Sequence, residues 1–161
     1  MMELNEAQWF EAIDLQVAAR IGLATLIGLL LGLEREIRGH DAGLRTHGLV
    51  ALSASLMTVM SIALYNQLGG PQSRIDPLRV IEAMATAISI LAAGLIIVRG
   101  GAVRNLTTAA HLWLTATLGI ASGAGFFALV LIGAAIALLL VIVLRVIEPK
   151  LPHVRDSDHD G

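Results

Sequence analysis

The sequence contains no cysteine, few aromatic residues and few charged residues, and each shortage excludes a class of protein. Without cysteine the 161-residue chain can form neither disulfides nor thiolate metal sites. Charged residues make up 15% of the chain and aromatic residues 4%, whereas soluble domains carry about 25% charged residues. The net charge of −2 offers no basic surface for nucleic acid. What remains is apolar sequence, 56% of the chain, with a mean hydropathy of +0.77.

Five apolar stretches are candidates to cross a bilayer, which takes about 20 residues of helix. We expect spans at residues 15–33, 47–64, 80–98, 106–121 and 126–145. A single helix over residues 106–144 would be about 58 Å long against a hydrocarbon core of about 30 Å, so this stretch must fold back. The sequence ASGAG at residues 121–125 suits the reversal, because glycine accepts positive φ angles. The predicted fold is all-α, a polytopic transmembrane helix bundle of about five spans.

This membrane domain, residues 15–145, occupies nearly the whole chain. Residues 1–14 are expected to form an N-terminal interfacial segment, and residues 146–161 a cytoplasmic tail without fixed structure. The N-terminal segment has no basic region and the first apolar run has no evident cleavage site, so we expect the first span to be retained. All four prolines lie outside the spans, at Pro71, Pro77, Pro149 and Pro152.

The distribution of basic residues predicts the orientation. With five spans, eight basic residues share one side of the membrane: Arg35, Arg38, Arg45, Arg99, Arg104, Arg145, Lys150 and Arg155. The other side has Arg74 and Arg79, with Arg20 inside a span near that face. Because basic residues collect in cytoplasmic loops, we expect the N-terminus outside and the C-terminus in the cytoplasm.

Small residues recur at helical spacing within the spans. Gly28 and Gly32 in span one, and Gly119 and Gly123 in span four, are each four residues apart, a spacing that lets two helix backbones approach closely. Span three carries a comparable line of Glu82, Thr86, Ser89 and Ala93. We expect spans one, three and four to pack tightly and span five, rich in Leu, Val and Ile, to face lipid. For the glycines, helix packing alone is the favoured interpretation.

Three ionisable residues lie within the spans: Arg20, Glu82 and His111. Arg20 is either an interfacial anchor or a partner for Glu82, which this topology places at a similar depth, since either charge alone is costly to bury. Glu82 also suits the positive end of a helix dipole, because Asp76 is placed as an N-cap before Pro77. His111 is expected to be a hydrogen-bonded packing residue rather than a metal ligand, and the sequence indicates no metal site.

Two charged loops on the expected cytoplasmic side form a candidate site. The turn at residues 99–105 and the helix start after it offer a setting for an anion, although any short cytoplasmic loop carries basic anchors. The loop at residues 34–46 mixes both signs of charge. We therefore predict a salt-bridged cytoplasmic cap in which Arg45 and Arg104 lie near Glu34. The residues assigned to the cap are Glu34, Arg35, Arg45, Thr46, Arg99, Arg104, Asn105, Thr107 and Thr108.

Four separated motifs, in order and spacing, resemble the MgtC/SapB family. They are GLLLGLERE at residues 28–36, AGLRTHGLV at 42–50, DPLR at 76–79 and RGGAVRNLTTAA at 99–110, followed by Leu112 and Trp113. The third motif contains Asp76 and Arg79, which we assign to the expected outer loop. The resemblance covers about residues 15–145. It implies a bacterial inner-membrane protein of about five spans, linked to magnesium limitation and acting as a regulator or homeostasis factor.

The chain departs from the family pattern at several places. Residues 87–94 read AISILAAG where the family has a glycine-rich stretch, and Asn105 stands where the family often has glycine. Ala102 replaces a residue that is often polar in the family. Because the sequence ends soon after the fifth span, we expect a short form without the soluble C-terminal domain that some members have.

Three classes of function are compatible with these features. The first is a regulatory or interaction protein that contacts the lipid bilayer and another membrane protein, or a second copy of itself. The second is a carrier of Mg²⁺ or protons that uses Arg20, Glu82 and His111, although one glutamate provides few of the oxygen ligands that magnesium needs. The third is an enzyme, for which no nucleophile with a base and no cofactor-binding motif is visible. We favour the first class, with no catalytic residues and no cofactor.

Overall fold

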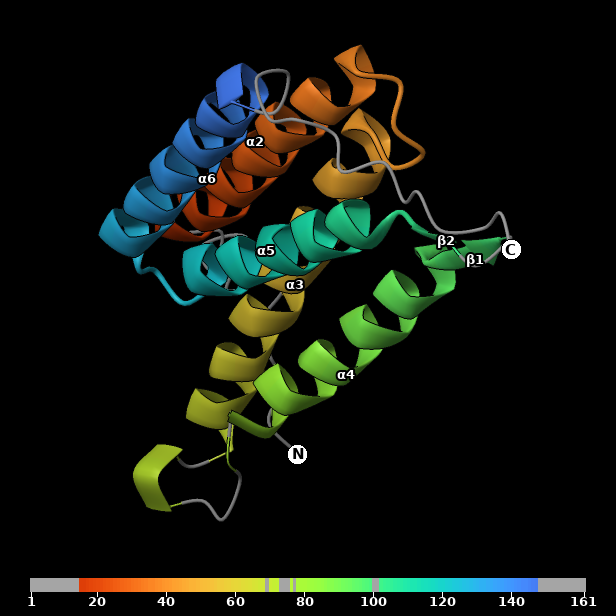
Figure 1. The fold of residues 1–161 in the computed structure, drawn as a ribbon. Helices are drawn as coiled ribbons and strands as arrows, with labels where there is room; N and C mark the ends of the chain where they lie inside the picture. The colour runs from red at the N-terminus through yellow and green to blue at the C-terminus, as the bar shows by residue number, and fades with distance from the viewer. Residues whose placement is uncertain (1–14, 69, 73–75, 77, 100–101, 148–161) are drawn as a thin grey trace, which may run out of the picture.

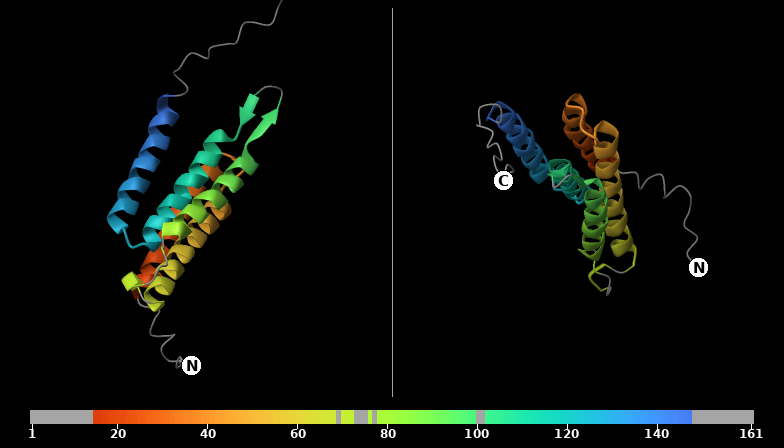
Figure 2. Two further views of the ribbon diagram at one scale, coloured as in Figure 1. Left: turned by 90° about the horizontal axis from the view of Figure 1, so that it is seen from below. Right: turned by 45° about the vertical axis from the view of Figure 1, so that its right-hand side comes forward.

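The structure, a computed structural model, describes residues 15–68, 70–72, 76, 78–99 and 102–147. Five long helices follow one another: α2 (Leu15–Ile37), α3 (Leu44–Gln67), α4 (Leu78–Leu95), α5 (Leu106–Gly123) and α6 (Phe127–Ile147), with a 3-10 turn at Gly70–Gln72. They run back and forth as an antiparallel bundle, with the β-hairpin β1–β2 at one end (Figures 1 and 2). The predicted five-helix bundle is confirmed. The expected segment 1–14 lies outside the described residues, as does the expected tail 146–161 from residue 148 onward, while residues 146 and 147 belong to α6.

Four helices, α2, α3, α4 and α6, are long and apolar enough to cross a membrane, and the chain is a multi-pass membrane protein. In the described part of the chain α5 falls short of that composition although it has 18 residues. The reason is its position, because α5 lies between α2, α3, α4 and α6 and contacts all four. A helix surrounded by protein can carry polar side chains that a lipid-facing helix cannot.

Span three ends earlier than the sequence suggested, and the fold is not purely helical. The helix α4 stops at Leu95, and Ile97–Arg99 (β1) pairs in antiparallel register with Ala102–Arg104 (β2). The β-branched residues Ile97, Val98 and Val103 favour extended backbone, and a short connection between them allows a hairpin. We name the end of the bundle with this hairpin and the loop 38–43 the basic end, and the opposite end the Arg20 end.

The core of the bundle is formed by α2, α3 and α5, with α3 in contact with both partners. A Cβ atom at Gly28 would lie 2.6 Å from the Cβ of Ala51, and one at Gly119 would lie 2.6 Å from the carbonyl oxygen of the same Ala51. A Cβ atom at Gly32 would lie 2.7 Å from the Cα of Leu44, and one at Gly123 would lie 2.7 Å from the carbonyl oxygen of Ser55. All four glycines therefore pack against α3.

The prediction that span three joins spans one and four in the tight core is wrong. Its place is taken by α3, whose buried residues are His47, Gly48, Ala51, Ala54, Ser55 and Thr58. The line of Glu82, Thr86, Ser89 and Ala93 on α4 is exposed. The physical reason is that α3 presents small side chains at four-residue spacing, and these accept the glycine faces of α2 and α5.

The outer helices α4 and α6 lie on opposite sides of this core (Figure 1). Val130, Ala134 and Ala137 of α6 pack against Ile27 and other apolar residues of α2 and α5. Most other residues of α6 up to Leu144 are exposed, with Leu139 60% exposed. That agrees with a lipid-facing span.

The α5–α6 reversal falls at the predicted glycine. Gly125 has φ +86°, its N–H donates to the carbonyl of Ser122, and the N–H of Phe126 donates to the carbonyl of Ala121. This is a Schellman motif, in which a left-handed residue ends a helix and satisfies its last carbonyls. A residue with a Cβ would be strained at that φ.

Candidate functional site: a buried polar junction at the basic end

The chain leaves α2 through a second Schellman motif. Gly39 has φ +70° and donates to the carbonyl of Glu36, while His40 donates to the carbonyl of Arg35. The Glu36 carboxylate then accepts a hydrogen bond from the N–H of Leu44 at 2.8 Å, which caps the first turn of α3. The sharp turn therefore holds the end of α2 against the start of α3.

Arg35 is the central residue of the junction at this end. It is only 4% exposed, and its Nη2 donates a short hydrogen bond to the hydroxyl of Thr108 in the first turn of α5. Its Nε is buried without a hydrogen-bond partner among the described residues. The single ion pair in the described part of the chain joins Glu34 to Arg38 instead. Arg35 thus links α2 to α5 while its positive charge has no directly bonded carboxylate.

Two histidines line the junction from α3 and α5. The rings of His47 and His111 meet edge to face with centroids 6.5 Å apart, and both lie within the electrostatic influence of Arg35. The Nδ1–H of His47 donates to the carbonyl of Gly43, which leaves Nε2 as the buried, unpaired ring nitrogen. His111 Nδ1 is likewise buried and unpaired within the described chain. A buried polar group without a partner costs about 1–3 kcal/mol, so a further hydrogen-bond partner would stabilise each of these two nitrogens.

Asn105 connects the hairpin to the rest of the junction. It precedes α5 with φ +64°, in the left-handed region that glycine and asparagine tolerate best. Its side-chain amide donates to the carboxylate of Asp41 at 2.7 Å and to the carbonyl of Leu95 at 3.2 Å. The loop 38–43, the end of α4 and the start of α5 are therefore tied together at one residue.

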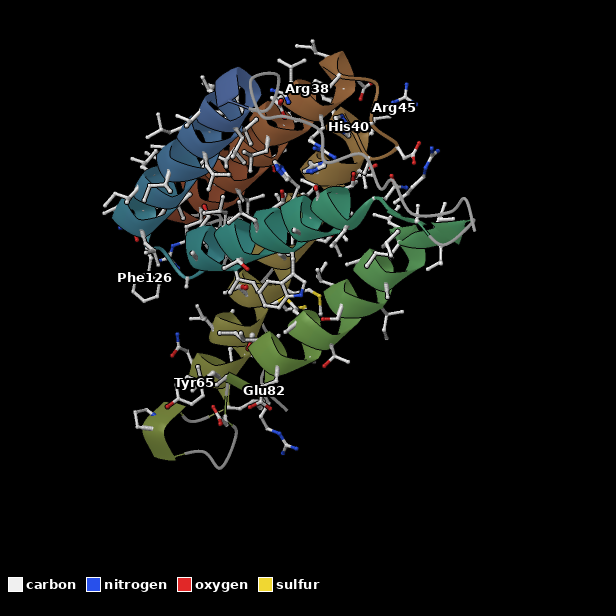
Figure 3. The ribbon with its side chains drawn as sticks, in the orientation of Figure 1. Arg38, His40, Arg45, Tyr65, Glu82 and Phe126 are labelled. Carbon is white, nitrogen blue, oxygen red and sulfur yellow. The ribbon has the colours of Figure 1, made fainter. Side chains whose placement is uncertain are left out.

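The predicted salt bridges between the two loops are not formed among the described residues, and the loops are joined by the Asn105–Asp41 hydrogen bond. Glu34 pairs with Arg38, the first residue after α2, and not with Arg45 or Arg104. Residues four apart at a helix end are already within reach, so this pair needs no contact between the loops. Figure 3 shows Arg38, His40 and Arg45 gathered at the basic end. The other cap residues, Arg45, Thr46, Arg104 and Thr107, are exposed, and the side chain of Arg99 lies outside the described residues.

A second polar junction closes the Arg20 end. The carbonyl of Arg20 accepts hydrogen bonds from the hydroxyls of Ser122 at 2.6 Å and Ser55 at 3.4 Å, and its guanidinium donates to the carbonyl of Gly123. The expected Arg20–Glu82 pair is not formed in the described structure. The C-terminal carbonyls and negative dipole end of α5 attract the guanidinium instead.

Glu82 lies on the surface of α4, near the end of the bundle opposite the labelled basic residues (Figure 3). Asp76 caps α4 as the sequence indicated, since its carboxylate accepts a hydrogen bond from the N–H of Leu78 at 2.9 Å. Arg79 is exposed one turn before Glu82. Among the described residues no cluster of three or more His, Asp or Glu side chains is arranged to hold a metal ion.

Sequence reasoning missed four residues of these junctions: Asp41, His47, Ser55 and Ser122. For two of them a signal was present. His47, Ala51 and Ser55 follow the same four-residue spacing that identified Gly28 and Gly32. Asp41 belongs to a loop, where spacing carries no information about partners, and Ser122 lies in the last turn of α5.

The fold and its two junctions define a class: a multi-pass helical membrane protein whose core helices meet at close glycine contacts and are joined at each end by the hydrogen bonds of an arginine, Arg35 at one end and Arg20 at the other. The chain belongs to the MgtC family, whose profile matches residues 21–150. Protein SapB of Bacillus subtilis is 36% identical over 74% of this chain and 51% of its own length. Protein MgtC of Brucella abortus is 38% identical over 85% and 53%.

A third relative, YhiD of Escherichia coli K12, is named as a candidate magnesium transporter and is 33% identical over 82% of this chain and 62% of its own length. The chain thus spans about half to three fifths of the length of these relatives. No solved structure matches it.

Proposed function

We propose that this protein is a regulatory or interaction factor in bacterial magnesium or ion homeostasis, located in the inner membrane, and not an enzyme. The link to magnesium rests on the family and on the name of the relative YhiD. The alternative is a carrier of Mg²⁺ or protons, which that name favours. Both share the fold, and they differ in whether an ion crosses the bundle.

The choice between a regulator and a carrier rests on one observation. Three charged side chains lie in or beside the α2–α3–α5 core: Arg35 is buried at the basic end, Glu34 is half-buried beside it and pairs with Arg38, and Arg20 is half-buried at the Arg20 end. Because Arg38 balances Glu34, the charges of Arg35 and Arg20 remain. A positive charge at each end of a narrow path is an electrostatic barrier to cations. Between them the backbones of α2, α3 and α5 meet at Gly28, Ala51 and Gly119, which leaves no room for an ion.

Glu82, the one carboxylate within a predicted span, does not supply a cation site in the core. Mg²⁺ takes six oxygen ligands in near-octahedral geometry, and Glu82 lies exposed on α4, outside the core. The buried hydroxyls of Thr58 and Thr115 donate to carbonyls of their own helices, so they offer no relay. The junction at the basic end is better suited to signalling. A set of buried polar groups that joins three helices can be rearranged by a partner or a local charge.

The test separates the two classes by flux. Purified wild-type protein and the Glu82→Gln variant are reconstituted in liposomes with a magnesium-sensitive or pH-sensitive dye inside. We expect no flux above empty liposomes from either, while both restore growth of a bacterium lacking its own family member at low magnesium. Flux from the wild type that Glu82→Gln abolishes would establish the carrier and exclude our proposal.

A further inference from the structure

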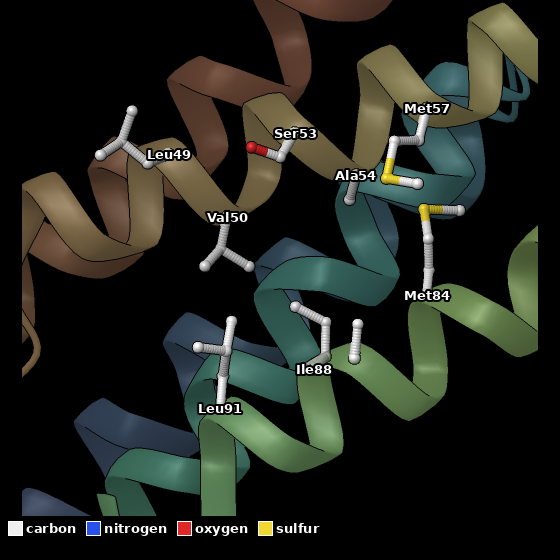
Figure 4. A pocket seen from close by; sticks show the side chains of 9 residues that line it. Leu49, Val50, Ser53, Ala54, Met57, Met84, Ile88 and Leu91 are labelled. Atoms are coloured by element: carbon white, nitrogen blue, oxygen red, sulfur yellow. The ribbon is translucent and has the colours of Figure 1, made fainter. Parts of the chain in front are cut away.

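The helix α4 is the least covered of the four apolar helices. Only 11% of its apolar window is buried, against 22–28% for α2, α3 and α6. Its inner side lines an apolar groove of about 250 Å³ against α3, where Met57 and Met84 face each other (Figure 4). A helix attached along one side only presents a broad outer face.

The composition of that outer face differs from the lipid-facing side of α6. Opposite Met84 and Ile88, at 100° per residue, α4 presents six exposed residues: Arg79, Glu82, Ala83, Thr86, Ile90 and Ala93. The exposed side of α6 consists of large apolar residues, among them Ile132, Ile136, Leu139, Leu140 and Val143. Lipid suits the α6 face, whereas small and polar residues on a helix suit contact with another helix.

The charges on the α4 face indicate what covers it. Arg79 and Glu82 are three residues apart, so they share this face, and neither belongs to an ion pair in the described chain. Two copies in one membrane have the same orientation, so their α4 helices meet in parallel with these residues at matching depths. Arg79 then lies one turn from Glu82 of the partner subunit, and a two-fold axis forms the pair twice. The face is therefore complementary to itself.

We propose that the outer face of α4 is the contact surface for a second copy of this chain, which forms a parallel two-fold dimer. Ala83, Thr86 and Ala93 allow close approach along the helix, and reciprocal Arg79–Glu82 pairs set the register. This inference stands apart from the proposed function, since either a regulator or a carrier can be dimeric.

Because the sequence has no cysteine, single cysteines report the contact without background. Ala83→Cys on the α4 face and the control Leu139→Cys on the exposed face of α6 are oxidised in native membranes and separated without reductant. We expect Ala83→Cys to shift to the mass of a dimer and Leu139→Cys to stay monomeric. Dimers of equal yield from both positions, a monomer in both, or an adduct of Ala83→Cys with another protein would each overturn the proposal.

The charge pairing is tested in the same background. Glu82→Arg should abolish the crosslink, and adding Arg79→Glu should restore it, because the swapped pair has the same complementarity. Both residues are exposed, and gel filtration of each variant checks that the protomer remains folded. Crosslinking unaffected by Glu82→Arg would refute the register, and loss that the double variant fails to restore would refute the pairing.

Discussion

Replacing Gly28 by alanine tests the packing of the core. In the structure the added Cβ would lie 2.6 Å from the Cβ of Ala51 and 2.7 Å from the carbonyl oxygen of His47. Carbon atoms in contact prefer about 3.5–4.0 Å, so α2 would have to move away from α3 by about 1 Å. Because Ala51 also touches α5 at Gly119, that movement disturbs both interfaces. Overpacking of this kind costs about 1–3 kcal/mol.

Gly22 on the same helix provides the matched control. A Cβ at Gly22 meets nothing within 4 Å, and alanine within a helix is favoured over glycine by about 0.5–1 kcal/mol. We therefore expect Gly22→Ala to unfold at or above the wild-type temperature in mild detergent, and Gly28→Ala clearly below it. The gain of alanine over glycine is common to both variants, so they should differ by the overpacking cost, roughly 1–3 kcal/mol. Equal stability of the two variants would refute the close α2–α3 contact.

Two further predictions concern the basic end and the orientation. Arg35→Met should keep or raise the thermal stability but fail to restore growth at low magnesium, because a buried charge without a directly bonded carboxylate costs more than its one bond to Thr108 returns. If Arg35→Met instead lowers the free energy of unfolding by about 3–5 kcal/mol, the charge of Arg35 is compensated in the wild-type fold and the reasoning is refuted. Reporters fused after Asn66 and after Gly161 should lie on opposite sides of the membrane, with the second in the cytoplasm. Signals from the same side would contradict the orientation inferred from the basic residues.

Several local features of the structure could be predicted residue by residue. Asp76 caps α4, Gly125 makes the α5–α6 reversal, and the line from Gly28 to Gly32 is buried, because each depends on a spacing of a few residues. The hairpin after Leu95 was missed. An apolar run at a span end reads equally well as helix or strand, and only the pairing with residues 102–104 decides between them.

By itself the sequence determined the number of helices in the bundle, their approximate ends and the face of α2 and α5 that packs, since these follow from length, hydropathy and four-residue periodicity. Only the tertiary structure decided which helix receives those faces and which group each charge meets. Periodicity marks a surface as able to pack, but every helix of a membrane bundle is a possible neighbour. Thus α3, rather than α4, packs in the core with α2 and α5. Arg20 donates a hydrogen bond to the carbonyl of Gly123 instead of pairing with Glu82, and Glu34 pairs with Arg38. In each case the partner that formed was the one that the fold placed within reach.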